Sequence, residues 1–121
     1  MVVDQFPIFP GCEDMVNYSE RKECADKKLL EYLFNHISYP PKARAGDVEG
    51  LVVVKFGVDA TGKVGEPELG RGVHTALDEE ALRVARQMLE EHPVWVPATK
   101  EGEAVAYEFK LPIKFKLATA I

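Results

Sequence analysis

The chain has 121 residues and a net charge of −5, with 46% hydrophobic and 29% charged residues. This length suits a single domain, which buries enough surface to fold without a metal or a disulfide lattice. The composition excludes a disordered chain, a collagen and a coiled coil, and no apolar run approaches the length that spans a bilayer. Residues 1–20 lack the basic and apolar stretches of a signal peptide. For a protein that acts outside the cytoplasm, we therefore expect the targeting segment to have been removed.

The first third of the chain predicts an extended arm followed by a helix. Residues 1–18 show neither a helical nor a strand period, so they predict the arm. Ser19 is a candidate helix cap, and Tyr39-Pro40-Pro41 predicts the end of the helix because residues before proline avoid the α region. Six apolar residues between them recur at helical spacing, namely Ala25, Leu29, Leu30, Leu33, Phe34 and Ile37. A short helical turn is expected over Lys42–Ala45.

The middle of the chain predicts a hairpin and a second long helix. Residues 51–59 alternate as a strand, with Val52, Val54, Phe56 and Val58 on one face. A second strand is expected over 64–71, after a turn that contains Gly62. Thr75 and Asp78 then predict a capping box for a helix that ends before Pro93. Its expected buried stripe consists of Leu77, Ala81, Leu82, Ala85, Met88 and Leu89.

Residues 105–117 give the strongest periodic signal, because apolar residues occupy every second position. Pro112 lies between them and has no N–H, which indicates an edge strand or a bulge. The order of elements predicts an α+β fold, with an antiparallel three-stranded sheet and two main helices packed on one face. We expect one compact unit, in which an arm and first helix over 1–37 precede a domain over 38–121.

Residues able to carry out catalysis are sparse. Nucleophile, phosphate-loop and zinc-protease motifs are missing from the sequence. His36, His74 and His92 stand far apart, at ends of predicted elements, where histidines are usually solvated or capping. Trp95 is expected in the core rather than on an exposed recognition surface. We therefore expect no catalytic residue, no bound metal and no cofactor.

Charge and cysteine usage leave two further questions. The only basic element is the last strand, through Lys110, Lys114 and Lys116, and these lysines fit a solvated outer face as well as a binding role. Nucleic acid is therefore not an expected partner. Cys12 and Cys24 have eleven residues between them. They are either free thiols in a cytosolic protein or a disulfide in an oxidising compartment, and two cysteines alone do not decide between these.

Several short motifs follow one another in a fixed order over residues 38–117. They are Tyr39-Pro40, Glu49-Gly50 before the strand that ends at Val58, Asp59-x-x-Gly62-x-Val64, Leu77–Ala81, Trp95-x-Pro97, Gly102 and the strand Phe109–Leu117. Together they resemble the C-terminal domain of TonB-type energy transducers. The family often has glycine where this chain has Ala98, and the transmembrane helix and proline-rich spacer of full-length transducers are absent from the sequence.

The N-terminal arm is similar to that of a subgroup found in Bacteroidetes-type bacteria, through Phe9-Pro10-Gly11-Cys12-Glu13 and the later Cys24. This similarity implies that the two cysteines form a disulfide in a periplasmic form of the protein. The family resemblance implies a periplasmic domain that a full-length parent anchors to the inner membrane. Its missing N-terminal part would contact the inner-membrane motor subunits.

The resemblance also implies a partner, namely the TonB box of an outer-membrane transporter, which binds by strand addition. Through this contact, the domain would transmit force derived from the proton-motive force and so drive nutrient uptake. The implied partner-binding residues are Tyr39, Pro40, Lys110, Leu111, Pro112, Ile113, Lys114 and Lys116. Tyr39-Pro40 fits equally well as a helix stop packed on the sheet. The exposed edge could instead pair two copies into a homodimer. The alternative functions are a structural or sensory periplasmic module that reuses the fold, or a small periplasmic enzyme, against which the scattered histidines argue.

Overall fold

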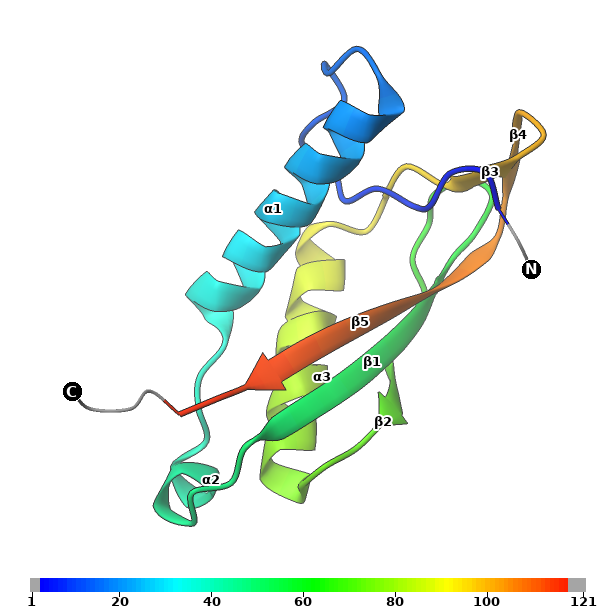
Figure 1. Cartoon of the computed structure of the whole chain (residues 1–121). Coiled ribbons are helices and arrows are strands. Elements are labelled where there is room, and N and C mark those ends of the chain that lie inside the picture. The colour runs from blue at the N-terminus through cyan, green and yellow to red at the C-terminus, as the bar shows by residue number, and fades with distance from the viewer. Residues whose placement is uncertain (1–2, 118–121) are drawn as a thin grey trace.

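The computed structural model describes residues 3–117 and has a three-stranded antiparallel sheet with helices on one of its faces (Figure 1). The predicted α+β fold is therefore confirmed. Residues 118–121 of the predicted domain over 38–121 lie outside the described residues. The elements are α1 (Tyr18–His36), α2 (Pro41–Ala45), β1 (Gly50–Val58), β2 (Glu68–Arg71), α3 (Thr75–Glu91), β3 (Ala98–Lys100), β4 (Glu103–Val105) and β5 (Tyr107–Phe115).

The main sheet has the strand order β2-β1-β5, so β5 lies at one edge. β1 and β5 pair without interruption from Gly50 opposite Phe115 to Val58 opposite Tyr107. The pairing of β1 with β2 is shorter, and its register shifts between Val53 and Val54. The prediction that Pro112 marks an edge strand is confirmed by this order.

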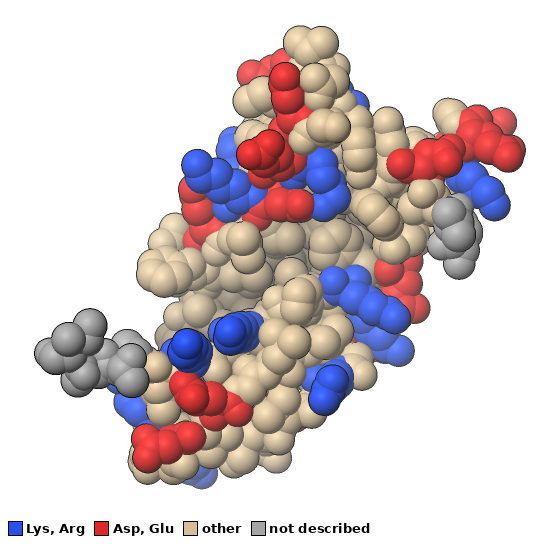
Figure 2. All heavy atoms as spheres, in the orientation of Figure 1, with Lys and Arg blue, Asp and Glu red and all other residues tan. Residues whose placement is uncertain are grey.

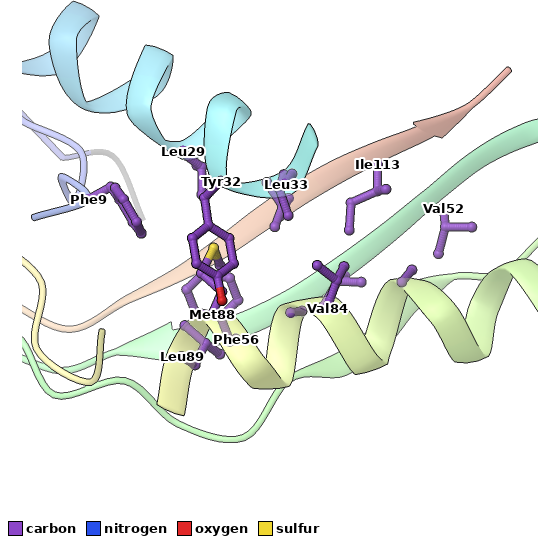
Figure 3. Packing of buried hydrophobic residues seen from close by; sticks show 14 of the residues in the cluster. Phe9, Leu29, Tyr32, Leu33, Val52, Phe56, Val84, Met88, Leu89 and Ile113 are labelled. Carbon is purple, nitrogen blue, oxygen red and sulfur yellow. The ribbon is translucent and has the colours of Figure 1, made fainter. Parts of the chain in front are cut away.

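The core lies between the sheet and the helices (Figure 3). β1 and β5 each turn alternate side chains into it, because successive side chains of a strand point to opposite faces. α3 contributes six buried side chains: Leu77, Ala81, Val84, Ala85, Met88 and Leu89. Full burial of a large aliphatic side chain contributes about 1.5–3 kcal/mol relative to exposure. The sheet and α3 thus form the stable frame on which the β5 edge is held.

Both predicted helix caps are wrong by one or two residues. Asn17, not Ser19, caps α1, with its Oδ1 accepting a hydrogen bond from the Glu20 N–H at 2.8 Å. α3 is capped by His74 rather than Thr75, through a 3.2 Å bond from the Ala76 N–H to Nδ1. Side chains that can cap occur close together at both places, and only the backbone geometry of the first turn decides which one accepts.

The buried stripe of α1 is narrower than its sequence predicts. Leu30 is 63% exposed and Phe34 is 83% exposed, although both fall at helical spacing from the buried residues. Those buried residues are Ala25, Leu29, Tyr32 and Leu33. The physical reason is that α1 lies at the margin of the core, where only one side of the helix meets other elements (Figure 1).

Two predicted strands are also shorter in the structure. Val105 belongs to β4 and pairs with Ala98 in a separate two-stranded sheet, so the long last strand begins only at Tyr107. A turn with positive φ at Glu101 and Gly102 folds β3 onto β4, which the alternating pattern did not reveal. The second predicted strand, over 64–71, is reduced to β2, apart from a single bridge between Val64 and Val58.

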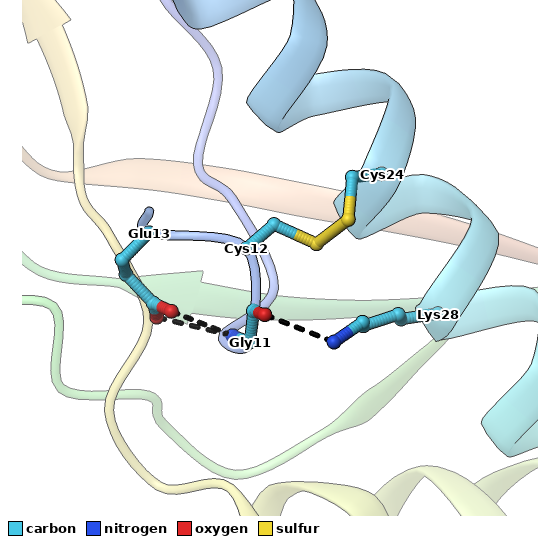
Figure 4. Close-up of a disulfide and its surroundings, with 5 residues drawn as sticks. All are labelled: Gly11, Cys12, Glu13, Cys24 and Lys28. Atoms are coloured by element: carbon cyan, nitrogen blue, oxygen red, sulfur yellow. Dashed lines mark hydrogen bonds between the residues drawn. A yellow bond between two sulfur atoms is a disulfide. The ribbon is translucent and has the colours of Figure 1, made fainter. Parts of the chain in front are cut away.

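The N-terminal arm is fastened to the rest of the molecule at several points. Cys12 and Cys24 form a disulfide that joins the arm to α1 (Figure 4). Beside it, the Lys28 Nζ donates a 2.9 Å hydrogen bond to the carbonyl of Gly11, whose φ of 121° favours glycine. Farther along the arm, the N–H of Ile8 donates to the carbonyl of Val96 at 3.0 Å. The arm is therefore part of the folded unit.

Candidate functional site

Within residues 3–117, there is no group of three His, Cys, Asp or Glu side chains that could hold a metal. In the same range, no helix has the length and apolar character needed to cross a membrane. Trp95 is 2% exposed, which confirms that it belongs to the core. His74 caps α3, as expected of a histidine at the end of an element.

The other two histidines meet at Tyr32, which their distance in the sequence did not reveal. The ring of His36 stacks on that of Tyr32 with centroids 4.0 Å apart, and His92 approaches it edge-on at 5.7 Å. The Tyr32 hydroxyl donates a 2.9 Å hydrogen bond to Glu91. Burial and this acidic acceptor raise the pKa of Tyr32 to about 12, so the phenol keeps its proton and ties α1 to α3.

The outer face of the sheet has a surface hollow of about 730 Å³ near the start of β5. Side chains of both charges line it, including Lys55, Lys63, Glu66 and Glu108. No buried side-chain nitrogen or oxygen among the described residues lacks a hydrogen-bond partner. The hollow therefore has no buried polar group that calls for a small ligand.

The strongest candidate site is the free edge of β5, and the direction of its backbone groups follows from β1. Within a strand, the N–H and C=O groups of successive residues point to opposite edges. The carbonyl of Gly57 accepts from the Gly65 N–H at 2.9 Å, on the β2 side of β1. The odd-numbered residues of β1 therefore point toward β2, and its even-numbered residues point toward β5.

The register then assigns each residue of β5 to one edge. Even-numbered residues of β1 stand opposite odd-numbered residues of β5, as in the pair Val52–Ile113. The odd-numbered residues of β5 therefore bond to β1, and the even-numbered ones turn their backbone groups to the free edge. Pro112 is among the latter, so its missing N–H costs the sheet no hydrogen bond. The free edge presents the N–H groups of Glu108, Lys110 and Lys114, with a gap at Pro112.

The predicted partner-binding residues of the last strand thus divide into two sets. Lys110, Pro112 and Lys114 are exposed on the outer face and have their backbone groups at the free edge, and Lys116 follows β5 as an exposed residue. Figure 2 shows lysine or arginine side chains along this strand. Leu111 and Ile113 are buried and bond to β1. Glu108 shares the free edge but was not predicted. The two-residue period of the strand could have identified it.

Tyr39 and Pro40 lie near the other end of the same strand. The ring of Tyr39 meets that of Phe115 edge-on with centroids 5.7 Å apart, and its hydroxyl donates to the carbonyl of Val48. Burial, followed by the nearby Glu49 carboxylate, raises the pKa of Tyr39 above its ordinary value. Pro40 precedes α2 as its N-cap residue. The structure therefore brings Tyr39 against the end of β5, from 76 residues away in the sequence.

Comparisons with known proteins agree with this architecture. The family model described as "Gram-negative bacterial TonB protein C-terminal" matches residues 35–117. A search of curated protein sequences finds no match. Solved structures that match include two NMR structures of the TonB C-terminal domain of Helicobacter pylori. The longer has 21% identity, a TM-score of 0.59, and coverage of 90% of this chain and 91% of its own.

The shorter Helicobacter pylori structure has 24% identity and a TM-score of 0.54, covering 78% of this chain and 95% of its own. At these identities the two structures show a shared fold. The family model adds more, because it matches well over half of the chain, including β1, α3, β5 and the Tyr39-Pro40 segment. The chain therefore belongs to the family of TonB protein C-terminal domains of Gram-negative bacteria.

Proposed function

We propose that this chain is the periplasmic domain of a TonB-type energy transducer, and that it binds the TonB box of an outer-membrane transporter. The binding mode is strand addition, in which an extended segment pairs with an exposed sheet edge. A full-length parent anchors the domain to the inner membrane and connects it to proton-driven motor subunits. The disulfide-linked arm supports assignment to the Bacteroidetes-like subgroup.

One observation carries this proposal, namely that β5 is a nine-residue edge strand with half of its backbone groups free. Each hydrogen bond formed by a docking strand has a net value of about 0.5–1.5 kcal/mol. At the free edge, the N–H groups of Glu108, Lys110 and Lys114 can each donate a hydrogen bond to the docking strand. Because Pro112 lacks a donor, the incoming strand accepts hydrogen bonds on either side of it and receives none at its centre.

The remaining predicted residues have supporting roles in this proposal. Leu111 and Ile113 fix β5 to β1 and to the core, so that the edge keeps its shape when a partner binds. Tyr39 and Pro40 extend the contact surface beyond the Phe115 end of the strand. Lys116 continues the row of positive charge.

Force transmission follows from the same pairing. A load that reaches the docked strand passes to β5 and then to β1, across nine paired positions. Antiparallel strands pulled along their length share the load among many hydrogen bonds. The long β1–β5 ladder is thus the element suited to carry force for nutrient uptake.

The test is an NMR titration of the domain with a peptide that covers the TonB box of a transporter from the same genome. We expect the largest amide shifts at Glu108, Lys110 and Lys114, with smaller shifts at the Tyr39 end. A structural or sensory module with no transporter partner would show no binding. Shifts confined to α3 would show that the peptide binds elsewhere and would rule out strand addition.

A further inference from the structure

Leu30 and Phe34 of α1 form an exposed apolar pair, which we call the α1 flank. Leu30 is 63% exposed and Phe34 is 83% exposed. They are four residues apart, so their side chains are neighbours on one side of the helix. Exposed apolar side chains that gather on one element mark an interaction surface more often than isolated ones do.

The α1 flank faces the β5 side of the molecule. Figure 3 shows Tyr32 directed toward α3 and Leu33 toward Ile113 of β5. Each residue advances about 100° around a helix. Phe34 therefore points about 100° beyond Leu33 and about 200° from Tyr32, on the side opposite to α3. Leu30 lies between Leu33 and Phe34 on this circle. The flank is therefore on the side of α1 that is turned away from α3, next to the free edge.

The segments before and after α1 contact the two ends of β5. Before α1, the ring of Phe6 in the arm approaches that of Tyr107 with centroids 5.8 Å apart. After α1, the ring of Tyr39 meets that of Phe115 at 5.7 Å. The last turns of α1, which carry the flank, therefore lie toward the arrowhead end of β5 (Figure 1). In Figure 2, a band without charged side chains separates the charges of α1 from the blue side chains over β5.

A strand added to β5 would lie about 4.8 Å beyond it and alternate its side chains between two faces. On the helix-facing side, those side chains would meet Leu33 and the α1 flank. On the outer side, they would stand beside Lys110 and Lys114, which are exposed. Cross-strand pairs of opposite charge stabilise a sheet. The edge is therefore bordered by two surfaces of different chemistry.

We propose that the α1 flank selects the partner strand, which carries apolar side chains facing α1 and acidic side chains facing the β5 lysines. This inference rests on the proposed strand addition and adds to it the sequence pattern of the partner. The flank lies before residue 35, where the match to the family model begins. The selection is thus a property of the arm and α1 that precede the matched domain.

A second copy of this chain fits the same surface poorly. An antiparallel pair of β5 strands centred on Pro112 would place Lys110 of one copy opposite Lys114 of the other. Like charges directly opposite each other destabilise strand pairing. The lysine row thus favours an acidic partner over self-association.

The experiment uses the disulfide-bonded protein and three eight-residue peptides with blocked ends. The first alternates leucine and glutamate, the second has serine in place of leucine, and the third has lysine in place of glutamate. Dissociation constants come from NMR titrations that follow the amides of β5. On the unmodified protein, we expect the leucine–glutamate peptide to bind roughly fivefold more tightly than each of the other two.

The variant Leu30→Ser with Phe34→Ser tests the flank itself. The leucine–glutamate and serine–glutamate peptides should bind this variant with nearly equal dissociation constants. The leucine–glutamate peptide should still bind more tightly than the leucine–lysine peptide. Val16→Ser is the matched control, because Val16 is 90% exposed but lies before α1. This control should keep both preferences. Far-ultraviolet circular dichroism confirms that the variants fold.

The possible results separate this inference from the proposed function. If the β5 amides shift but the double variant keeps the leucine preference, strand addition stands and the role of the α1 flank is wrong. If neither these peptides nor a TonB-box peptide moves the amides of Glu108, Lys110 and Lys114, strand addition itself is wrong, and the inference that rests on it is overturned too.

Discussion

The two edges of the main sheet are built in opposite ways. β2 has four residues and a register shift against β1, caused by the extra residue Gly70. β5 has nine residues in unbroken register. Short or bulged edge strands prevent unwanted pairing with other chains. The β2 edge is thus protected from further strand pairing by its short length and its irregular register. The other stays long and open, with lysines and a single proline to limit what can pair with it.

The largest effect is expected when proline is placed on the β1 side of β5. Ile113 has a buried side chain, and its N–H points to β1. Ile113→Pro should lower the free energy of unfolding by about 3 kcal/mol or more, through the lost hydrogen bond and the disturbed core. Denaturant unfolding measures this change. Unchanged stability would mean that Ile113 points to the free edge and that the assignment of the two edges is reversed.

The disulfide joins the arm, which pairs with Thr99 of β3, to α1 and lies in neither edge strand. Replacing both Cys12 and Cys24 by Ser should lower the free energy of unfolding by about 3 kcal/mol, since the chain-entropy model gives this value for a loop of such length. Thermal unfolding with and without reductant checks the same quantity in the unmodified protein. Equal melting temperatures in the two conditions would contradict the prediction.

Proline on the open side of β5 should affect docking rather than folding. Lys114→Pro removes a free-edge N–H that no element of the described residues uses, so the fold should keep its stability. Binding of a TonB-box peptide should weaken roughly tenfold, by the loss of one hydrogen bond and the clash of the proline ring. Lys114→Ala is the matched control, because it removes the charge but keeps the N–H. Equal losses in the two variants would point to the side chain instead of the backbone.

Acid should weaken the anchoring of the segment that leads from α1 to Tyr39. Partial burial by itself raises the pKa of Glu80, but hydrogen bonds from Arg83 and from the Ser38 N–H outweigh it and set the pKa below its ordinary value of 4.5. The stabilisation is therefore present above pH 4.5 and is lost as the pH falls through the lowered pKa. Its size should be about 1 kcal/mol at most, because Arg83 is half exposed.

A comparison with Glu80→Gln checks this pH dependence. The variant should be slightly less stable at neutral pH and should lose less stability between neutral pH and pH 3. Urea unfolding at both pH values measures the difference. Parallel losses in the two proteins would assign the acid sensitivity to other carboxylates.

The smallest effect is expected from Pro112→Ala, which would restore a donor to the open edge. Folding should change little, because no hydrogen bond within the described chain uses this position. Binding of a TonB-box peptide should tighten by at most a few fold, since a net hydrogen bond has a value near 1 kcal/mol. Weaker binding would show that the proline ring itself contacts the partner. Sedimentation of the variant reports whether the restored edge also pairs two copies.

Alternation and helical spacing predicted the elements that build this comparison. The strands around Val54 and Ile113 and the helix around Ala85 were all predicted, because each buries a regular stripe of side chains. Residue patterns did not predict the small β3–β4 sheet, which depends on a turn at Glu101 and on pairing with the distant arm. Such contacts are decided by tertiary packing, which a local pattern does not contain.

The candidate site was predicted in part for the same reason. Pro112 indicated an edge strand from its missing N–H alone. The sequence did not reveal which residues of β5 face the open edge, since this follows from the register with β1. It also predicted burial for Leu30 and Phe34, because helical spacing shows which residues share a side but not how far the neighbouring elements extend.

The disulfide in the arm also limits how far the chain can stretch. Eleven residues lie between Cys12 and Cys24, and an extended chain gains about 3.3–3.6 Å per residue. Only five of these residues, 13–17, precede α1, so without the bond, pulling the arm away from β3 would release roughly 20 Å of slack before tension reached the first turn of the helix. With it, tension passes from Cys12 directly to Cys24, and the intervening loop stays relaxed. Because the disulfide-linked arm lengthens less under load, more of a displacement applied to the arm reaches α1.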